Sequence, residues 1–298
     1  MKKRLKAIDK GILYMIGASL TFALMGGFAK VLGGVIPPLE VTFFRNIFGV
    51  VIISLSFYKM PITQKGGKPL LLFFRGFIGF LALLTYFYDM AYIPLGEAVT
   101  YNKTSPLFLA FFAWLFLGEK LPKSAILALI FGFLGIILIA KPQGGTFDKY
   151  DILGIFSGIG AALAYTSIRE LKNYYNTRTI ALSFMLIGTL APLLLMIIAE
   201  FIEVSPTYDF LISKFVMPQG ISWIYIFAMG ILATASQLLM TKAYSLTQAG
   251  IVGTITYSQI LFGVFVGVML GDDLPDLWSF LGITFVIIAG LLVTLPKK

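Results

Sequence analysis

The residues from Ala91 to Pro142 recur in a diverged copy from Ala243 to Pro296. The turn Leu117–Gly118–Glu119 in the first copy corresponds to Leu270–Gly271–Asp272 in the second, 153 positions later. An offset that stays almost constant over such a length indicates internal duplication, and missing a repeat would lead to the wrong fold. The chain should therefore be built from two copies of one structural unit.

Continuous apolar runs fill most of the sequence and indicate which solvent surrounds it. Hydrophobic residues make up 58% of the 298 residues and charged residues only 12%, whereas soluble domains carry about 25% charged residues. The apolar runs are unbroken and do not alternate with polar residues, which favours helices over a membrane β-barrel. We therefore predict an all-α integral membrane protein that has the lipid bilayer as a partner.

Ten of these apolar runs are long enough to cross a bilayer as helices. They fall at residues 11–32, 39–58, 70–91, 96–117, 124–141, 151–169, 179–200, 221–241, 248–270 and 277–295. Five belong to the first unit, residues 1–142, and five to the second, residues 143–298. Because five is odd, the second unit enters the membrane upside down, as in secondary transporters built from inverted repeats. The long connection at residues 200–220 is predicted to hold a short helix at the membrane surface.

Basic residues are distributed unequally over the connecting segments. With a cytoplasmic N-terminus, the inner segments carry sixteen Lys and Arg residues and the outer loops carry three, namely Lys141, Lys149 and Lys214. Cytoplasmic loops of membrane proteins are enriched in Lys and Arg. The asymmetry predicts a multi-pass protein of the cytoplasmic (inner) membrane with both termini in the cytoplasm.

Composition excludes several classes of function. The formal net charge is +9, but no soluble domain is predicted that could present a basic patch, so a nucleic acid is not an expected partner. The sequence holds no cysteine and no histidine, which excludes disulfides, thiol chemistry and the commonest metal ligand. It also lacks a Gly-rich Walker loop for ATP. No metal and no cofactor is expected.

Short motifs carry a family resemblance. They are Pro106–Leu107–Phe108, the run Phe116–Leu117–Gly118–Glu119–Lys120–Leu121 and the counterpart that ends in Gly271–Asp272. With these motifs the chain resembles the drug/metabolite transporter superfamily, in its EamA-type branch of ten-helix proteins. Phe43–Phe44–Arg45 and Arg75–Gly76 are also similar to the subgroup with S-adenosylmethionine and riboflavin uptake carriers. The resemblance covers nearly the whole chain and implies a secondary carrier of small metabolites.

Charged residues inside the predicted helices are the candidates for function. They are Lys30, Glu40, Arg45, Arg75, Asp89, Glu97 and Lys103. Each costs about 2.5–3.5 kcal/mol at a helix centre, so a charge in this place is a functional hypothesis by default. The alternative for Lys30, Glu40, Asp89 and Glu97 is that they lie at the outer interface and reach water. Arg75 is expected to reach the lipid headgroups on the cytoplasmic side.

Arg45 and Lys103 lie too deep for that alternative. Their depths are about 9 Å and about 10–12 Å, at the rise of an α-helix. Both should line a watery cavity, where they contact substrate or pair with Glu40, Asp89 or Glu97. Pro106 supports this for Lys103, because a proline inside a helix disrupts the backbone one turn earlier, near Asn102. Broken helices at mid-membrane mark transporter sites, although a kink that serves packing alone is the alternative.

The predicted substrate-binding set follows from these positions and from the second copy, where Gln259 occupies the place of Pro106. It comprises Lys103, Arg45, Asn102, Tyr101, Glu97, Asp89, Tyr257, Gln259 and Gln237. Hydrogen bonds between helices explain Tyr257 and Gln237 equally well. The cluster around Lys103 is charged where many relatives are uncharged, so a named substrate cannot be carried over from the resemblance.

These observations favour a secondary transporter that moves a small anionic or zwitterionic metabolite, such as an amino acid, by alternating access and without ATP hydrolysis. A non-transporting membrane scaffold is one alternative. An intramembrane enzyme is another: Tyr88–Asp89 matches half of an aspartyl protease motif, but its partner motif is missing at Gly271–Asp272. If protons are partners in transport, Asp89, Glu97 or Glu40 should carry them, because there is no histidine; uncoupled diffusion is equally open.

Overall fold

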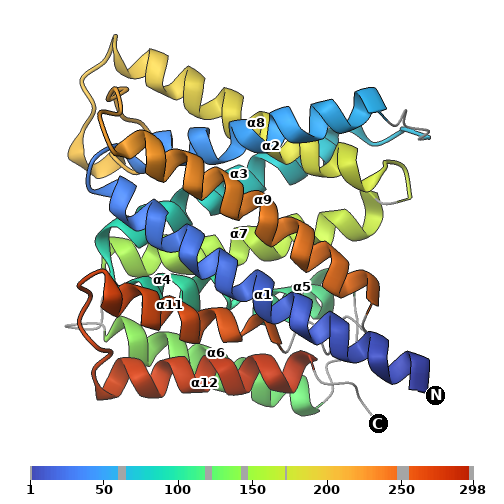
Figure 1. The fold of residues 1–298 in the computed structure, drawn as a ribbon. Coiled ribbons are helices and arrows are strands. Elements are labelled where there is room, and N and C mark those ends of the chain that lie inside the picture. The colour runs from blue at the N-terminus through green and yellow to red at the C-terminus, as the bar shows by residue number, and fades with distance from the viewer. Residues whose placement is uncertain are drawn as a thin grey trace.

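The computed structural model describes residues 2–59, 65–117, 123–141, 147–171, 173–246 and 255–294, and within these ranges it contains helices and no strand. The helices lie side by side in a bundle (Figure 1). We call the end at which α1 begins and α12 ends the terminal end. The opposite end holds residues 34–37 and 200–221, and we call it the loop end.

The first half of the chain forms five crossings from six helices. They are α1 (Lys2–Gly33), α2 (Pro38–Lys59), α3 (Pro69–Tyr92), α4 (Leu95–Asn102), α5 (Ser105–Leu117) and α6 (Lys123–Ala140). Helices α4 and α5 together make the fourth crossing. Prolines at the starts of α2 and α3 suit the first helical turn, where a missing N–H leaves no bond unmade.

The second half repeats this order. Its helices are α7 (Lys149–Leu171), α8 (Thr177–Ala199), α9 (Ser222–Leu246), α11 (Ser258–Met269) and α12 (Leu277–Thr294). In the described residues, six helices are long and apolar enough to cross a membrane alone, and the shorter apolar helices lie in α6, α11 and α12. The elements match the ten predicted crossings, of which the ninth is described from residue 255, so the all-α fold of two inverted five-helix repeats is confirmed.

The helix contacts follow the two-fold relation between the inverted repeats: a contact between two helices recurs between their equivalents. Helix α1 packs on α9, and the equivalent pair, α7 on α3, packs in the same way. Three further contacts join equivalent elements directly: α2 with α8, α4 with α11, and α6 with α12. Each repeat therefore buries its apolar faces mainly against the other repeat, which is how two such units form one transporter fold.

Small residues let two of these helices approach closely. A Cβ atom on Gly135 of α6 would lie 2.8 Å from the carbonyl oxygen of Gly282, and one on Gly282 of α12 would lie 2.7 Å from that of Gly135. Larger side chains at either position would push the helices apart. Without a hydrophobic driving force between helices in lipid, such close contacts supply the packing energy.

Large apolar side chains cover the outside of the bundle. Leu70 is 83% exposed, Ile231 64% and Leu261 61%. Apolar surface of this extent is costly in water, and it fits a surface that faces lipid.

The fourth crossing is broken at Lys103 and Thr104, close to Pro106, as predicted. The Thr104 carbonyl oxygen accepts hydrogen bonds from the amides of Leu107 (2.8 Å) and Phe108 (3.3 Å). Thr104 thus starts α5, and Pro106 lies in its first turn, where its missing N–H does no harm.

The second copy contains a break that the sequence did not predict. Residues 255–256 are helical, Tyr257 forms a turn, and α11 begins at Ser258. The continuous span expected over 248–270 is therefore wrong at this point. The short helix expected in residues 200–220 is present only as the three-residue 3₁₀ helix Pro206–Tyr208.

Candidate functional site

A cavity of about 370 Å³ lies between the two repeats. Its polar lining comprises Arg45, Arg75, Tyr86, Asn102, Lys103, Tyr165, Gln237 and Gln259. The first repeat supplies the first five of these residues and the second repeat the last three. We call this space the central cavity. Its volume falls in the range of small-molecule sites, which is about 300–1,000 Å³.

Lys103 reaches the central cavity from the break between α4 and α5. Its backbone amide donates to the Val99 carbonyl oxygen at 3.0 Å, so it still closes the last turn of α4. Its ammonium group has no carboxylate within ion-pair distance among the described residues. The predicted alternative of an ion pair with Glu97, Asp89 or Glu40 is therefore not what the structure shows.

Arg45 enters the same cavity from α2 and is only 6% exposed. Its Nη1 atom donates to Oδ1 of Asn46 at 2.9 Å. Asn46 is itself fixed, because its Nδ2 atom donates to the carbonyl oxygens of Thr42 (2.8 Å) and Gly188 (3.2 Å). In the described part of the chain, the Arg45 Nε atom has no hydrogen-bond partner.

Arg75 lines the central cavity, although the sequence analysis assigned it to the membrane surface. It was expected to reach the lipid headgroups, but it is 9% exposed and lines the central cavity. Its guanidinium carbon lies 4.9 Å from the centre of the Phe184 ring, and that of Arg45 lies 5.6 Å from the same centre. The sequence held one sign of this arrangement, the glycine at position 79, one helical turn after Arg75. A Cβ atom at Gly79 would lie 2.5 Å from Nη1 of Arg75, so this glycine makes room for the guanidinium.

Glutamines of the second repeat form part of the facing wall. Gln259, 3% exposed, lies in the first turn of α11 after the break at Tyr257. Gln237 of α9 lines both the central cavity and a neighbouring cavity. Amide side chains both donate and accept hydrogen bonds, so this wall is polar without charge.

The predicted acidic residues do not line the central cavity. Glu40 is fully buried and its Oε2 atom accepts a hydrogen bond from the Val216 amide at 3.0 Å. Glu97 accepts one from the Ser279 hydroxyl at 2.6 Å. Asp89 is fully buried too, and neither of its carboxyl oxygens has a hydrogen-bond partner among the described residues. Reaching water at the interface is therefore excluded for Glu40 and Asp89.

Two predicted aromatic site residues also lie outside the cavity lining. The Tyr101 hydroxyl donates to Oδ1 of Asp151 at 2.6 Å and ties α4 to the start of α7. Tyr257 is 2% exposed and packs on Gly290, where an added Cβ atom would lie 1.8 Å from its ring. The structure brings together Lys103, Arg45, Asn102, Gln259 and Gln237 from the predicted set, and places the other four elsewhere.

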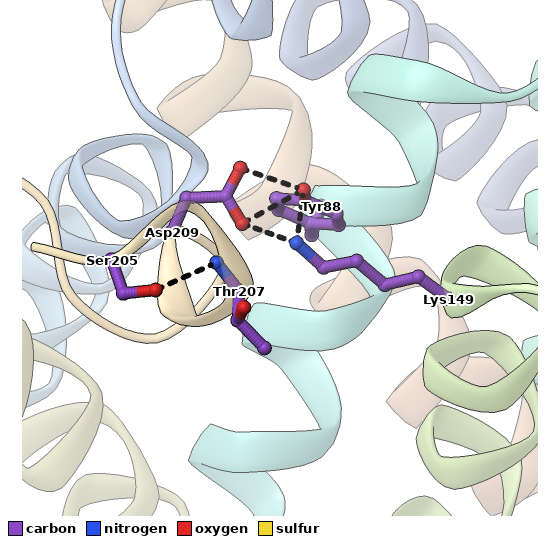
Figure 2. Close-up of polar contacts among 5 residues, drawn as sticks. All are labelled: Tyr88, Lys149, Ser205, Thr207 and Asp209. Atoms are coloured by element: carbon purple, nitrogen blue, oxygen red, sulfur yellow. Dashed lines mark hydrogen bonds and ion pairs between the residues drawn. The ribbon is translucent and has the colours of Figure 1, made fainter.

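The connection between α8 and α9 closes over the loop end. Figure 2 shows the carboxylate of Asp209 in this connection accepting a hydrogen bond from the Tyr88 hydroxyl, 3.0 Å to either oxygen, and pairing with the Lys149 ammonium. Tyr88 belongs to α3 and Lys149 to α7. We call this three-residue contact the loop latch. Together with the bond from Val216 to Glu40, it holds the connection against α2, α3 and α7.

A further contact closes the same end between the repeats. The Lys30 ammonium pairs with Asp272 at 2.7 Å and donates to the Ile93 carbonyl oxygen at 2.9 Å. Asp272 also accepts from the Leu95 amide at 2.8 Å, at the start of α4. Both charges are thus satisfied in a structural contact between the turn after α11 and helices α1 and α4.

The central cavity continues toward the terminal end instead. Its lining includes Ile168, Ile180 and Met240, which lie close to the ends of α7, α8 and α9 on that side. Tyr165, which also lines it, is 52% exposed. An adjoining apolar cavity of about 330 Å³ shares Arg45 and runs between α2, α8 and α9 to Ser56 and Arg178.

An all-helical membrane protein of two inverted repeats, with a polar cavity between them that is covered at one end, has the architecture of a secondary transporter. Comparison with known proteins agrees. Residues 9–141 and 148–295 each match the EamA-like transporter family, and the chain belongs to that family. The resemblance to drug/metabolite transporters is thereby confirmed.

Similarity to known proteins extends over nearly the whole chain. The pseudopaline exporter CntI of Pseudomonas aeruginosa is 30% identical over 297 residues, which cover 99% of each chain. An uncharacterized transporter of Helicobacter pylori is 31% identical over 291 residues, 96% of this chain and 95% of its own. A riboflavin transporter of Vibrio cholerae is 23% identical over 299 residues, 96% of this chain and 93% of its own.

A solved crystal structure has the same fold. It matches 98% of this chain and 96% of its own with a TM-score of 0.53, at 17% sequence identity. The likeness supports the architecture and carries no information about the substrate.

Proposed function

We propose that the protein is a secondary transporter that moves a small organic anion or zwitterion, of the size of an amino acid, across the cytoplasmic membrane by alternating access. One observation carries the proposal: a cavity between inverted repeats is lined by cations that have no carboxylate partner in the described residues. A buried charge without a partner is costly. A substrate anion would supply the missing partner.

The two ends of the bundle support alternating access. The loop end is held by the loop latch and by the pair of Lys30 with Asp272, while the central cavity leads to the terminal end. The largest contact between the repeats, α1 with α9, has an equivalent in α7 with α3, so an exchange between these two packing arrangements would close the opposite end. We take the boundary between the repeats to lie between residues 142 and 143, and both termini to lie in the cytoplasm. The central cavity then opens toward the cytoplasm.

The named relatives support transport of small molecules without fixing its direction. One is named an exporter of pseudopaline and another a transporter of riboflavin. We infer that no chemical conversion accompanies transport, since the relatives are named as carriers. A scaffold would gain nothing from a cavity that holds unpaired cations, whereas a carrier of anions needs one.

Lys103 provides the direct test. Cells that lack the gene would be supplied with the wild-type chain or with Lys103→Met, and metabolites in cells and medium would be profiled without preselection. Wild type should change the distribution of one or a few anionic metabolites, and Lys103→Met should abolish the change at equal expression. The matched control is Lys68→Met, which removes a lysine paired with Glu170 outside the cavity. Identical profiles for Lys103→Met and wild type would refute the proposal.

A further inference from the structure

Three cationic side chains, Arg45, Arg75 and Lys103, line the central cavity, and no Asp or Glu of the described residues lines it. We propose that the substrate is an organic anion with at least two acidic groups, and that Arg75 is a binding residue that distinguishes it from a monoanion. This inference rests on the proposed function and specifies the substrate class of the same site.

The first step of the argument is the charge balance of the cavity. The carboxylates of the neighbouring helices do not line it. Glu97 accepts a hydrogen bond from Ser279 and Glu40 one from the Val216 amide, and the fully buried Asp89 lies outside the lining. A monoanion would leave two of the three cations without a counter-charge. Buried charges are tolerated when they are paired and hydrogen-bonded, so a ligand with two or three negative charges fits this lining better than a ligand with one.

The second step is the arrangement of the two guanidinium groups. Arg45 comes from α2 and Arg75 from α3, yet both lie over the ring of Phe184 on α8, at 5.6 and 4.9 Å. The ring attracts both cations and so offsets part of the repulsion between two like charges. In each of them the Nε atom has no hydrogen-bond partner among the described residues. Guanidinium groups bind carboxylates and phosphates through paired N–H donors.

The third step is the position of Lys103 and the neutral wall. Lys103 enters from the helix break, so the cavity offers a compact ammonium group in addition to the two guanidinium groups of Arg45 and Arg75. Gln237 and Gln259 add neutral hydrogen-bonding groups for the rest of the molecule. The lining therefore describes a small polar metabolite whose acidic groups all bind to the first repeat.

Carboxylates and phosphate monoesters share this chemistry, and a binding experiment separates them. The purified full chain would be titrated in detergent with glucose, acetate, succinate, citrate, inorganic phosphate and glucose 6-phosphate at constant ionic strength, with thermal stabilisation as the readout. At least one multiply charged organic probe should bind about tenfold or more tightly than acetate, a difference of about 1.4 kcal/mol. Stabilisation by succinate or citrate identifies carboxylates, and stabilisation by glucose 6-phosphate identifies phosphate esters.

Variants assign the preference to Arg75. Arg75→Gln should reduce the ratio of affinities to within about twofold, while Lys68→Gln, which also removes one positive charge, should keep the wild-type ratio. Arg75→Lys keeps the charge without the fork and serves where Arg75→Gln does not fold; it should weaken the multiply charged probe more than acetate. Equal affinities for acetate and the multiply charged probes, no stabilisation by any of those probes, or an unchanged ratio in the Arg75 variants would overturn the inference. If Lys103→Met still abolishes the metabolite change in cells, the proposed function survives that failure.

Discussion

Asp89 differs from the other carboxyl groups that the helices bury. Glu40, Glu97 and Asp151 each accept a hydrogen bond, whereas neither oxygen of Asp89 has a partner in the described part of the chain. The charged groups near it are Asp148 and Asp151, and the nearby tyrosines are Tyr86 and Tyr101. Burial without a cation or a donor disfavours the charged form of a carboxyl group, so Asp89 is the buried acid that the described residues stabilise least as an anion.

We therefore predict that any proton coupling runs through Asp89. Once a transported metabolite is known, vesicles with an imposed pH gradient should accumulate it with the wild-type chain. Asp89→Asn should let it equilibrate without accumulation, because the amide cannot release a proton. Glu203→Gln, an exposed acid of the long connection, is the control. Normal coupling in a variant that combines Asp89→Asn with Glu97→Gln and Glu40→Gln would rule out carboxylates as the proton carriers.

Depth along a helix predicted part of the site and missed the rest. Arg45 and Lys103 were singled out because they lie several residues from a helix end, and both line the cavity. Arg75 is as deep, but it was assigned to the nearer membrane surface. The assumption that a charged side chain near a helix end reaches the nearer membrane surface fails where a cavity opens at that end of the bundle. Such a side chain then faces the cavity and not the lipid. Only the packing of α3 on α8 shows this.

The connection between α8 and α9 is the element that covers the loop end. It contains little regular structure. Its polar tie to α3 and α7 passes through the carboxylate of Asp209 (Figure 2), and the Phe210 ring adds contacts with Tyr88 and Lys149. A segment held by a few polar contacts opens more readily than a packed helix. The loop latch should thus set how often the central cavity is reached from the loop end.

Weakening the loop latch should expose the cavity to that side. The chain has no cysteine, so Ala82→Cys gives a single thiol in the cavity lining. A maleimide reagent that cannot cross membranes should label this thiol from the loop end roughly two- to tenfold faster when Asp209→Asn is added, because such a bond contributes about 0.5–1.5 kcal/mol. Asp273→Asn, an acid of another loop at this end, is the control. An unchanged labelling rate would show that the latch does not hold the closed state.

The sequence predicted where the helices lie, but it predicted only one of the two breaks within them. The apolar runs located every crossing that the structure describes, since only helices of that length satisfy the backbone in lipid. The break before α5 was predicted from Pro106, because a proline disrupts the helix backbone one turn earlier. The break at Tyr257 has no proline to announce it. Around this break α11 packs on α1 and α4, and Tyr257 lies against Gly290 of α12. These are tertiary contacts that local sequence does not reveal.

At the scale of the whole molecule, the two repeats are equivalent in fold and unequal in charge. The three cations of the central cavity, Arg45, Arg75 and Lys103, all come from the first repeat, and the second contributes Tyr165, Gln237 and Gln259. The duplication was visible in the sequence because the turn at Glu119 recurs at Asp272. The charge asymmetry was visible too, but its meaning depended on the convergence of α2, α3 and the helix break on one cavity.

Because all crossings belong to one bundle, the orientation of the protein in the membrane is settled by which end of the bundle faces the cytoplasm. The sequence assigns sixteen Lys and Arg residues to the predicted inner segments and three to the predicted outer loops. This distribution predicts that the terminal end and the opening of the cavity face the cytoplasm. Reporter fusions after Lys149 and after Asp273 should therefore be active outside the cytoplasm, and a fusion after Lys65 inside it. Lys149 follows the fifth crossing and Asp273 the ninth, so an even number of crossings separates them and the two fusions must report the same side. One reversed reading among the three would refute the orientation, and a disagreement between Lys149 and Asp273 would refute the count of crossings between them.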